Sequence, residues 1–245
     1  MVTSSGAYSW NSKQKEIDLL TQADITAEYY NLQAQHYHEK YYGNRSRAEA
    51  VLKHEINLLR STFRNLDVIE IACGTGFWTE SVAITADSVY ATDINASMID
   101  VAKRRLVHLD NVSLGVSDVF RVSREPRKYS GAFCVLFWCH IPVQRIEEFL
   151  AALCASLKPG SPVIFIDQLE DSDVKKHTTD RYGNRIAKRE LDGKPFFVVK
   201  NIHSATQLHN YLEDFAEVGS VRYSSHPDGS GMWTLLWNTA GRADV

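Results

Sequence analysis

The stretch Val68-Ile69-Glu70-Ile71-Ala72-Cys73-Gly74-Thr75-Gly76 decides the fold class of this chain. A short apolar run with β-branched residues leads directly into a turn with two glycines, which predicts a buried strand over 67–72 followed by a tight turn. Glycines at 74 and 76 let the backbone approach a ligand that a Cβ atom would exclude. Because residues 77–86 can form the next helix, the stretch predicts a strand–turn–helix unit with a ligand at the turn.

Strands and helices alternate regularly on both sides of this unit. Further apolar strands are expected at 88–92, 112–116, 132–138 and 162–167, with helices at 96–107 and 146–157 between them. Such alternation is typical of a parallel sheet that is covered on both faces. Two more strands, 218–223 and 232–237, predict a closing hairpin around the turn at 226–231. The expected fold is therefore α/β: a Rossmann-like, doubly wound, mostly parallel seven-stranded sheet with an antiparallel C-terminal hairpin and N-terminal lid helices.

The remaining segments are assigned to one domain over 1–245, because the chain has no internal repeat, low-complexity tract or domain linker. Outside the core, helices are expected at 25–42, 48–63 and 208–215, a strand at 196–200, and a solvated charged excursion at 170–189. The expected divisions are an N-terminal lid or arm (1–45), a cofactor-binding core (46–167), a substrate-side insertion (168–203) and a C-terminal helix and hairpin (204–245).

The composition excludes several classes of function. The 245 residues include 27 Lys and Arg and 30 Asp and Glu, and the net charge of −3 argues against a dedicated nucleic-acid binder. No apolar run approaches the roughly 20 residues that span a bilayer, and residues 1–15 lack the apolar segment of a secretory signal. Cys73, Cys134, Cys139 and Cys154 include no CxxC pair, so we expect reduced thiols, no zinc site and a cytoplasmic protein without membrane contact.

The carboxylates near the glycine turn indicate which ligand the turn binds. Asp93 ends the second strand, 17 residues after Gly76, where a carboxylate can accept both hydroxyls of a ribose. A dinucleotide site would need a third glycine, but Thr79 occupies that position. Glu70, just before the turn, would repel a pyrophosphate but suits a ligand with an ammonium or sulfonium group. The charges therefore disfavour a nicotinamide dinucleotide.

Residues 68–79 resemble motif I of the class I S-adenosylmethionine-dependent methyltransferases, and the likeness runs from about residue 29 to 237. The order and spacing of further segments match the family, and Phe137-Trp138-Cys139-His140-Ile141-Pro142 is similar to a segment of its small-molecule branch. The other matching segments are Asp93-Ile94-Asn95, Ser117-Asp118-Val119 and Lys158-Pro159-Gly160. Two departures stand out: Ala72 replaces the first glycine of the turn, and Tyr129-Ser130-Gly131 lacks the usual aspartate at the start of the fourth strand.

The resemblance implies S-adenosyl-L-methionine as cofactor, S-adenosyl-L-homocysteine as product, no metal, and methylation of O or N in a small-molecule acceptor. The implied acceptor contacts are Tyr29, Trp138, His140, His203 and Trp233, and the N-terminal tyrosines would close over both ligands. The implied cofactor contacts are Tyr30, Tyr37, Glu70, Ala72, Gly74, Gly76, Trp78, Asp93, Ile94, Met98, Asp118, Val119 and Phe137. Trp78 and Met98 have core packing as an alternative role, and Asp118 has loop capping. Ordinary packing is the alternative for Tyr29, Tyr30 and Tyr37, and a plain strand position is the alternative for Trp233.

His140 is the candidate catalytic residue. It follows the fourth strand, where the family brings acceptor and methyl group together, and an imidazole with an ordinary pKa near 6.5 suits removal of a proton from the acceptor. The alternative is that His140 bonds backbone groups and positions Trp138.

Two other functions stay open at this point. A protein or nucleic-acid methyltransferase is disfavoured, because the chain has no basic excess and no Asn/Asp-Pro-Pro-aromatic segment after the fourth strand. A non-catalytic module that keeps the cofactor fold for binding partners is disfavoured by the intact set of Glu70, Gly74, Gly76 and Asp93. The sequence is compatible with a monomer or a homodimer.

Overall fold

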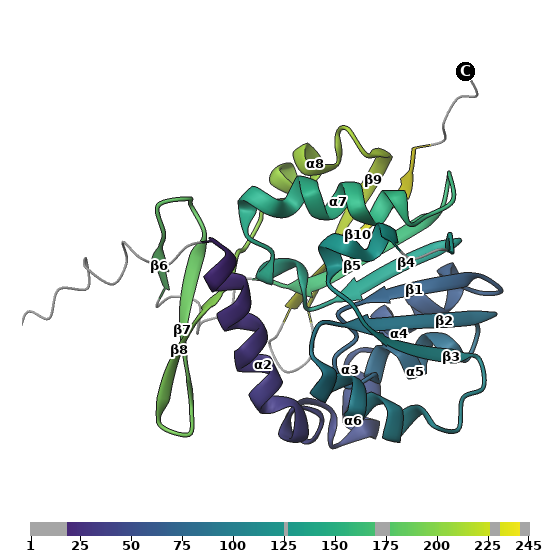
Figure 1. Cartoon of the computed structure of the whole chain (residues 1–245). Helices are drawn as coiled ribbons and strands as arrows, with labels where there is room; N and C mark the ends of the chain where they lie inside the picture. The colour runs from purple at the N-terminus through teal and green to yellow at the C-terminus, as the bar shows by residue number, and fades with distance from the viewer. Residues whose placement is uncertain (1–18, 125–126, 170–176, 226–230, 241–245) are drawn as a thin grey trace, which may run out of the picture.

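The computed structural model describes residues 19–124, 127–169, 177–225 and 231–240, and its centre is one seven-stranded sheet (Figure 1). The strand order is β3-β2-β1-β4-β5-β10-β9. β1 to β5 run parallel, whereas β10 is antiparallel to both β5 and β9. The expected fold class is therefore confirmed. The strands are β1 (Asp67–Ile71), β2 (Ser88–Asp93), β3 (Val112–Val116), β4 (Gly131–Val135), β5 (Pro162–Gln168), β9 (Ala216–Ser225) and β10 (Gly231–Thr239).

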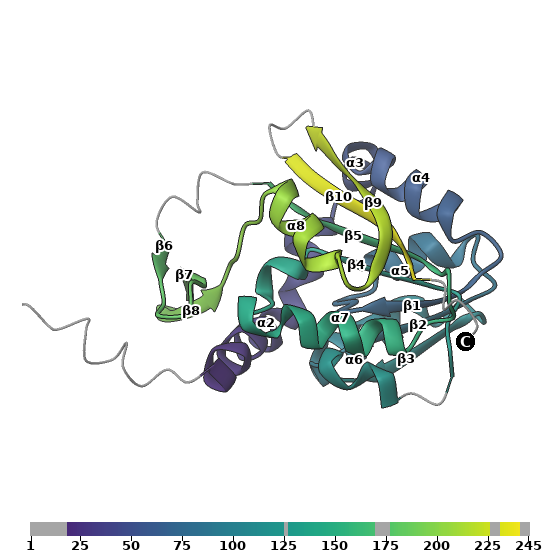
Figure 2. The same ribbon diagram turned by 90° about the horizontal axis from the view of Figure 1, so that it is seen from above.

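Helices cover both faces of this sheet (Figure 2). Neighbouring residues of β1 point into two different cores, because successive side chains of a strand face opposite sides. Val68 packs with α4 (Lys53–Thr62) and α5 (Phe77–Ala83), while Ile69 packs with α7 (Ile146–Ala155) and α8 (Ala205–Leu212). α6 (Ala96–Leu106) connects β2 to β3 and contacts both strands. This burial on both faces explains why the strands read as continuous apolar runs.

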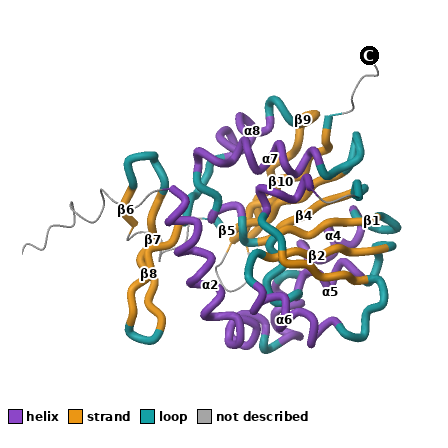
Figure 3. Tube along the Cα trace, viewed as in Figure 1, coloured by secondary structure: helices purple, strands orange, loops and turns teal. Residues whose placement is uncertain are grey.

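A long N-terminal helix and a small second sheet lie beside the main sheet (Figures 1 and 3). The helix is α2 (Leu19–Tyr42), and the small antiparallel sheet has the order β6-β7-β8. α2 packs against β8, where the rings of Tyr29 and Phe196 lie 5.5 Å apart, and against α6, where Ser97 bonds Asn31. We call α2 the lid helix below. The small sheet comprises β6 (His177–Thr179), β7 (Arg185–Leu191) and β8 (Lys194–Val199).

The prediction of a solvated excursion at 170–189 is wrong for residues 177–179 and 185–189, which form β6 and most of β7. In β7, exposed Lys188 and Glu190 alternate with buried Ala187, which packs on the lid helix. A strand that buries one face carries charge on the other, and this alternation was hidden by the high charge of the whole segment.

Several element boundaries also differ from the sequence expectation. The helix expected at 48–63 is divided into α3 (Arg45–Val51), capped by Asn44, and α4. The strand expected at 132–138 ends at Val135, because Leu136 adopts a left-handed conformation with φ of 60°. The chain then forms the short 3₁₀ helices η2 (Trp138–His140) and η3 (Val143–Arg145). Residues 1–18 of the expected arm and the hairpin turn at 226–230 lie outside the described residues.

Within the described ranges, no helix combines the length and the apolar character needed to cross a bilayer.

Candidate active site

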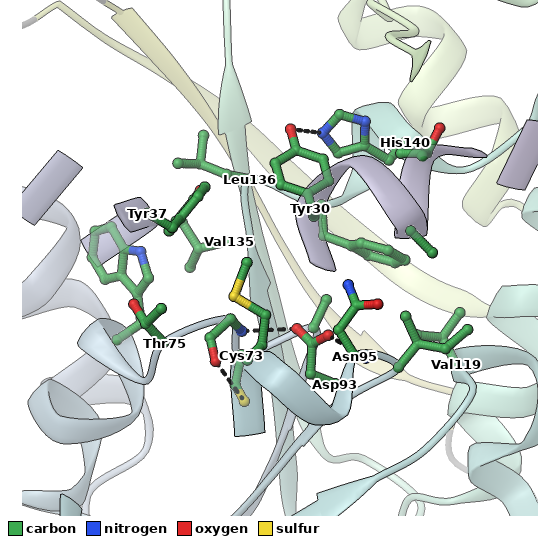
Figure 4. A pocket seen from close by; sticks show the side chains of 18 of the residues that line it. Tyr30, Tyr37, Cys73, Thr75, Asp93, Asn95, Val119, Val135, Leu136 and His140 are labelled. Atoms are coloured by element: carbon green, nitrogen blue, oxygen red, sulfur yellow. Dashed lines mark hydrogen bonds between the residues drawn. The ribbon is translucent and has the colours of Figure 1, made fainter. Parts of the chain in front are cut away.

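A cavity lies at the carboxyl ends of β1, β2 and β4, beside the lid helix (Figure 4). This is the edge where ligands bind in open parallel sheets. The cavity brings together most of the residues predicted from sequence. These are Tyr30, Tyr37, Ala72, Gly74, Trp78, Asp93, Ile94, Met98, Asp118, Val119, Phe137 and His140.

The glycine turn forms one wall of the cavity, and its two glycines have different roles. Gly74 has a φ of 53°, and a Cβ built there would meet no heavy atom of the described residues within 4 Å, so it leaves a cradle open to the cavity. Gly76 has a φ of 79° and precedes α5, and a Cβ there would lie 2.7 Å from Cδ1 of Leu106. Gly76 is therefore a packing residue and does not line the cavity among the described residues.

Asp93 joins the end of β2 to the glycine turn. Its Oδ2 accepts a hydrogen bond from the Gly74 N–H, and its Oδ1 accepts one from the Asn95 N–H, both at 2.9 Å (Figure 4). Burial raises the pKa of Asp93, although the backbone hydrogen bonds oppose this shift. Each carboxylate oxygen can accept a second hydrogen bond, so the fixed carboxylate can also receive the two hydroxyls of a ribose.

Glu70 lies behind the glycine turn rather than on the cavity wall. Its side chain is 1% exposed, and its Oε2 accepts a 2.5 Å hydrogen bond from Oγ1 of Thr79. Burial, together with the neighbouring Asp93, raises the pKa of Glu70 to about 8, although the hydrogen bond from Thr79 opposes the shift. Glu70 is thus mainly protonated at neutral pH, whereas the sequence argument assumed a charged carboxylate facing the ligand.

Tyr30 of the lid helix and His140 of η2 form a hydrogen-bonded pair over the cavity (Figure 4). The Tyr30 hydroxyl lies 2.9 Å from Nε2 of His140, and Nδ1 lies 2.6 Å from the carbonyl oxygen of Val199. A carbonyl can only accept, so Nδ1 carries the hydrogen and Nε2 accepts from Tyr30. Burial lowers the pKa of His140 to about 3 and raises the pKa of Tyr30. Both groups are therefore neutral at physiological pH.

Aromatic rings from the lid helix complete the wall, and sequence reasoning missed some of them. Tyr42 stacks on Phe77 at 4.1 Å with an angle of 7° between the rings. The ring centroids of Tyr30 and Tyr37 lie 6.0 Å apart. The available signal for Tyr42 was the crowding of tyrosines between residues 29 and 42. The other missed lining residues are Thr26, Ala27, Cys73, Thr75, Phe77, Asn95, Phe120, Val135, Leu136, Ile141 and Pro142.

Four expected acceptor contacts lie elsewhere among the described residues. Trp138 is fully buried, and its ring centroid lies 5.1 Å from that of Phe165. The ring of Trp233 lies in the same core, with its centroid 6.4 Å from that of Trp138. His203 contacts Trp138 at 6.2 Å and is buried with it. Tyr29 packs between the lid helix and the small sheet. These four side chains do not line the cavity among the described residues, and because the strand ends at Val135, the next turn directs Trp138 into the core.

Within the described residues, no group of three or more His, Cys, Asp or Glu side chains could hold a metal ion. The four cysteines are free thiols, and Cys73, Cys134 and Cys139 are buried.

Three comparisons with known proteins place this cavity in context. A family model described as a methyltransferase domain matches residues 68–160. Ubiquinone biosynthesis O-methyltransferase from Coxiella burnetii is 27% identical over 106 residues, which are 42% of this chain. The match spans 44% of that relative, less than half of its length.

Solved structures match over nearly the whole chain. A DhpI–SAH complex is 28% identical with a TM-score of 0.71, and the match covers 90% of this chain and 98% of that one. A DhpI–SAM–HEP complex is 29% identical with a TM-score of 0.68, covering 87% and 97%. The structural likeness therefore extends well beyond residues 68–160, which the family model matches.

Proposed function

Because the chain belongs to the class I S-adenosylmethionine-dependent methyltransferases, we propose that it transfers a methyl group to an oxygen or nitrogen of a small-molecule acceptor. The observation that carries this proposal is that one cavity joins the Asp93–Gly74 contact at one side to the Tyr30–His140 pair at the other. The Asp93–Gly74 contact is suited to binding a nucleoside, and the Tyr30–His140 pair is suited to accepting a proton.

The cavity residues fit the cofactor. The Gly74 cradle accommodates an approaching ligand, and Asp93 offers its remaining lone pairs to the ribose hydroxyls. Met98 and Val119 would face the adenine, with Asp118 near its amino group. S-adenosylmethionine supplies a methyl group on a sulfonium sulfur, which is a built-in leaving group.

The task of the chain's own residues is then to align the acceptor and remove its proton. Since Tyr30 donates its hydrogen to His140, the Tyr30 oxygen can accept a hydrogen bond from an acceptor O–H or N–H. A proton that moves to the Tyr30 oxygen is balanced by the Tyr30 proton moving to Nε2 of His140. Tyr30 stays neutral and His140 becomes an imidazolium. With a pKa of about 3, His140 is a weak base. It can therefore take up the acceptor proton only when that proton has become more acidic, as the bond between the acceptor atom and the methyl carbon forms.

A small acceptor fits the enclosure of the site. The lid helix crosses the cavity and is held on both sides, by β8 and by α6. An acceptor must therefore fit beneath it or enter when it moves. The names of the relatives, an O-methyltransferase of ubiquinone biosynthesis and DhpI in complex with SAM and HEP, support a small-molecule acceptor over a protein or nucleic acid.

The test is an acceptor screen that measures S-adenosylhomocysteine release. The full chain is incubated with S-adenosylmethionine and with small alcohols, phenols, acids and amines, in parallel with peptides and RNA. We expect release with a small molecule and none with the macromolecules. Release only with peptides or RNA would contradict the acceptor class, and failure to bind the cofactor would contradict the enzyme proposal itself.

A further inference from the structure

The end of β8 and the two residues after it form hydrogen bonds with the 3₁₀ helix that carries His140 and with the residue that follows this helix. The Val199 carbonyl accepts from Nδ1 of His140 at 2.6 Å. Two residues later, the Asn201 N–H donates to the Cys139 carbonyl at 2.7 Å, and Nδ2 of Asn201 donates to the Ile141 carbonyl at 2.9 Å. Residues 199–201 therefore bond His140 and both of its neighbours in the chain. We call this segment the clamp.

The clamp is fixed by a buried amide network. Asn201 is 3% exposed, and its Oδ1 accepts the Arg185 N–H at 2.9 Å. Its Nδ2 lies 3.1 Å from Oδ1 of Asn184, which is fully buried and also accepts the Val143 N–H at 2.8 Å. Such an amide is costly to replace by an apolar side chain, because the backbone groups that it satisfies are left buried without partners. The network thus ties the small sheet to the loop that follows β4.

The clamp also contacts the lid helix. The Val199 N–H donates to Oγ1 of Thr26 at 3.2 Å. Thr26 precedes Tyr30 by four residues on the same face of α2. Tyr30 bonds Nε2 of His140 directly, and Thr26 bonds the residue that holds Nδ1. Both ring nitrogens of His140 are therefore connected to one face of the lid helix.

We propose that Asn201 is a positioning residue and that the clamp holds His140 in its Nδ1–H tautomer only while the lid helix is closed. This inference rests on the proposed function, since it assigns the small sheet a part in preparing His140 for proton transfer. In the Nδ1–H tautomer the Nε2 lone pair faces Tyr30. The other tautomer would carry a hydrogen on Nε2 and could not accept the Tyr30 proton.

The experiment observes the His140 tautomer and needs no acceptor. The full chain is labelled with ¹⁵N-histidine, and two-bond ¹H–¹⁵N correlations are recorded with S-adenosylhomocysteine added; His140→Gln assigns the signals. In the wild type we expect one pyrrole-type and one pyridine-type nitrogen for His140. Asn201→Leu should bring the two ¹⁵N shifts together, as in a tautomer mixture. Thr26→Val should shift them in the same direction by a smaller amount.

Asn111→Leu is the matched control. Nδ2 of Asn111 also donates to two backbone carbonyls, those of Ala83 and Ala86, at 2.9 and 3.1 Å, but Asn111 directly precedes the amino end of β3, whereas the cavity lies at the carboxyl ends of the strands. We expect this variant to lower the melting temperature and to leave the His140 signals unchanged.

Unchanged His140 signals in Asn201→Leu would overturn the proposal. If that variant does not fold, Thr26→Val decides alone, because unchanged signals there would remove the link to the lid helix. Calorimetric titration with S-adenosylhomocysteine separates the two claims: a wild type that shows one tautomer but binds no ligand would contradict the proposed function and leave the clamp intact.

Discussion

The Tyr30 hydroxyl lies 2.9 Å from Nε2 of His140, although the two residues are 110 positions apart in the sequence. This contact joins the lid helix to the loop after β4 directly above the cavity. Burial disfavours the charged form of both partners, lowering the pKa of His140 and raising that of Tyr30. The contact therefore bonds the lid helix to the loop after β4, and the proposed proton path rests on it.

Tyr30→Phe removes the hydroxyl and keeps the ring. We expect kcat to fall by about 10²-fold, since proton transfer by a positioned group contributes on this order. The KM for S-adenosylmethionine should change little. The measurement is S-adenosylhomocysteine release with an acceptor from the screen. Tyr41→Phe is the control, because Tyr41 is an exposed tyrosine of the same helix. Equal kcat values for the two variants would exclude Tyr30 from the proton path.

Glu70→Gln should change how stability depends on pH. Burial holds the pKa of Glu70 at about 8 in the folded chain, against an ordinary value of 4.5. The folded chain therefore binds more protons between these values, and this group makes the free energy of unfolding fall as the pH rises from 5 to 8. The variant should lose this contribution, which is at most about 4 kcal/mol between pH 5 and 8.

The Glu70 prediction is measured by urea unfolding at several pH values. Glu28→Gln is the control, because Glu28 is exposed on the lid helix. The curve of Glu70→Gln should be flatter than those of the control and the wild type. Three parallel curves would show that Glu70 is already ionised in the folded chain at neutral pH.

The seven-stranded sheet and the cavity edge could be predicted because their determinants are local. Short apolar strands such as 67–71 require burial on both faces, and parallel strands end at a common edge. Asp93 and Gly74 meet for this reason, although the sequence separates them by 19 positions. In contrast, the left-handed conformation of Leu136 could not be predicted, because leucine is not a residue that favours a positive φ. That single turn sends Trp138 into the core and His140 toward the lid helix.

The small sheet could not be predicted from charge alone. Lys188 and Glu190 made the segment look solvated, but they alternate with residues that pack on the lid helix. The bond between Thr26 and Val199 spans 173 positions and has no local signature. Contacts between the lid helix and the small sheet depend on how the two pack together. The periodicity of apolar residues within a strand or helix does not encode this packing.

Ala72→Gly should stabilise the chain. Ala72 has a φ of 54°, a conformation that glycine adopts without a Cβ penalty. We expect the free energy of unfolding to rise by about 0.5–1 kcal/mol, the penalty being partly offset by the greater freedom of glycine in the unfolded state. Gly76→Ala is the opposite case, since its Cβ would lie 2.7 Å from Leu106. Urea unfolding should show a gain for the first and a loss for the second; a loss for both would contradict the argument from strain.

Arg105→Gln should weaken binding of S-adenosylhomocysteine. The Arg105 guanidinium donates to the Thr75 carbonyl of the glycine turn at 2.6 Å and to Glu80 at 2.9 Å, so it fixes the cavity wall from outside. We expect the Kd to rise about tenfold, the effect of one lost charge-assisted hydrogen bond. Arg60→Gln is the matched control, because Arg60 also donates to a backbone carbonyl, that of Ser81. Equal Kd values for the two variants would show that Arg105 does not act on the turn.

We propose that Asp93 and the glycine turn hold the nucleoside of S-adenosylmethionine. Calorimetric titration of the full chain with S-adenosylhomocysteine tests it most directly, with Asp93→Ala beside the wild type. We expect one binding site in the wild type and at least a hundredfold weaker binding in the variant, because two charge-assisted hydrogen bonds to the ribose are lost, each contributing about 1.5–3 kcal/mol. No binding by the wild type, or equal binding by both proteins, would contradict it.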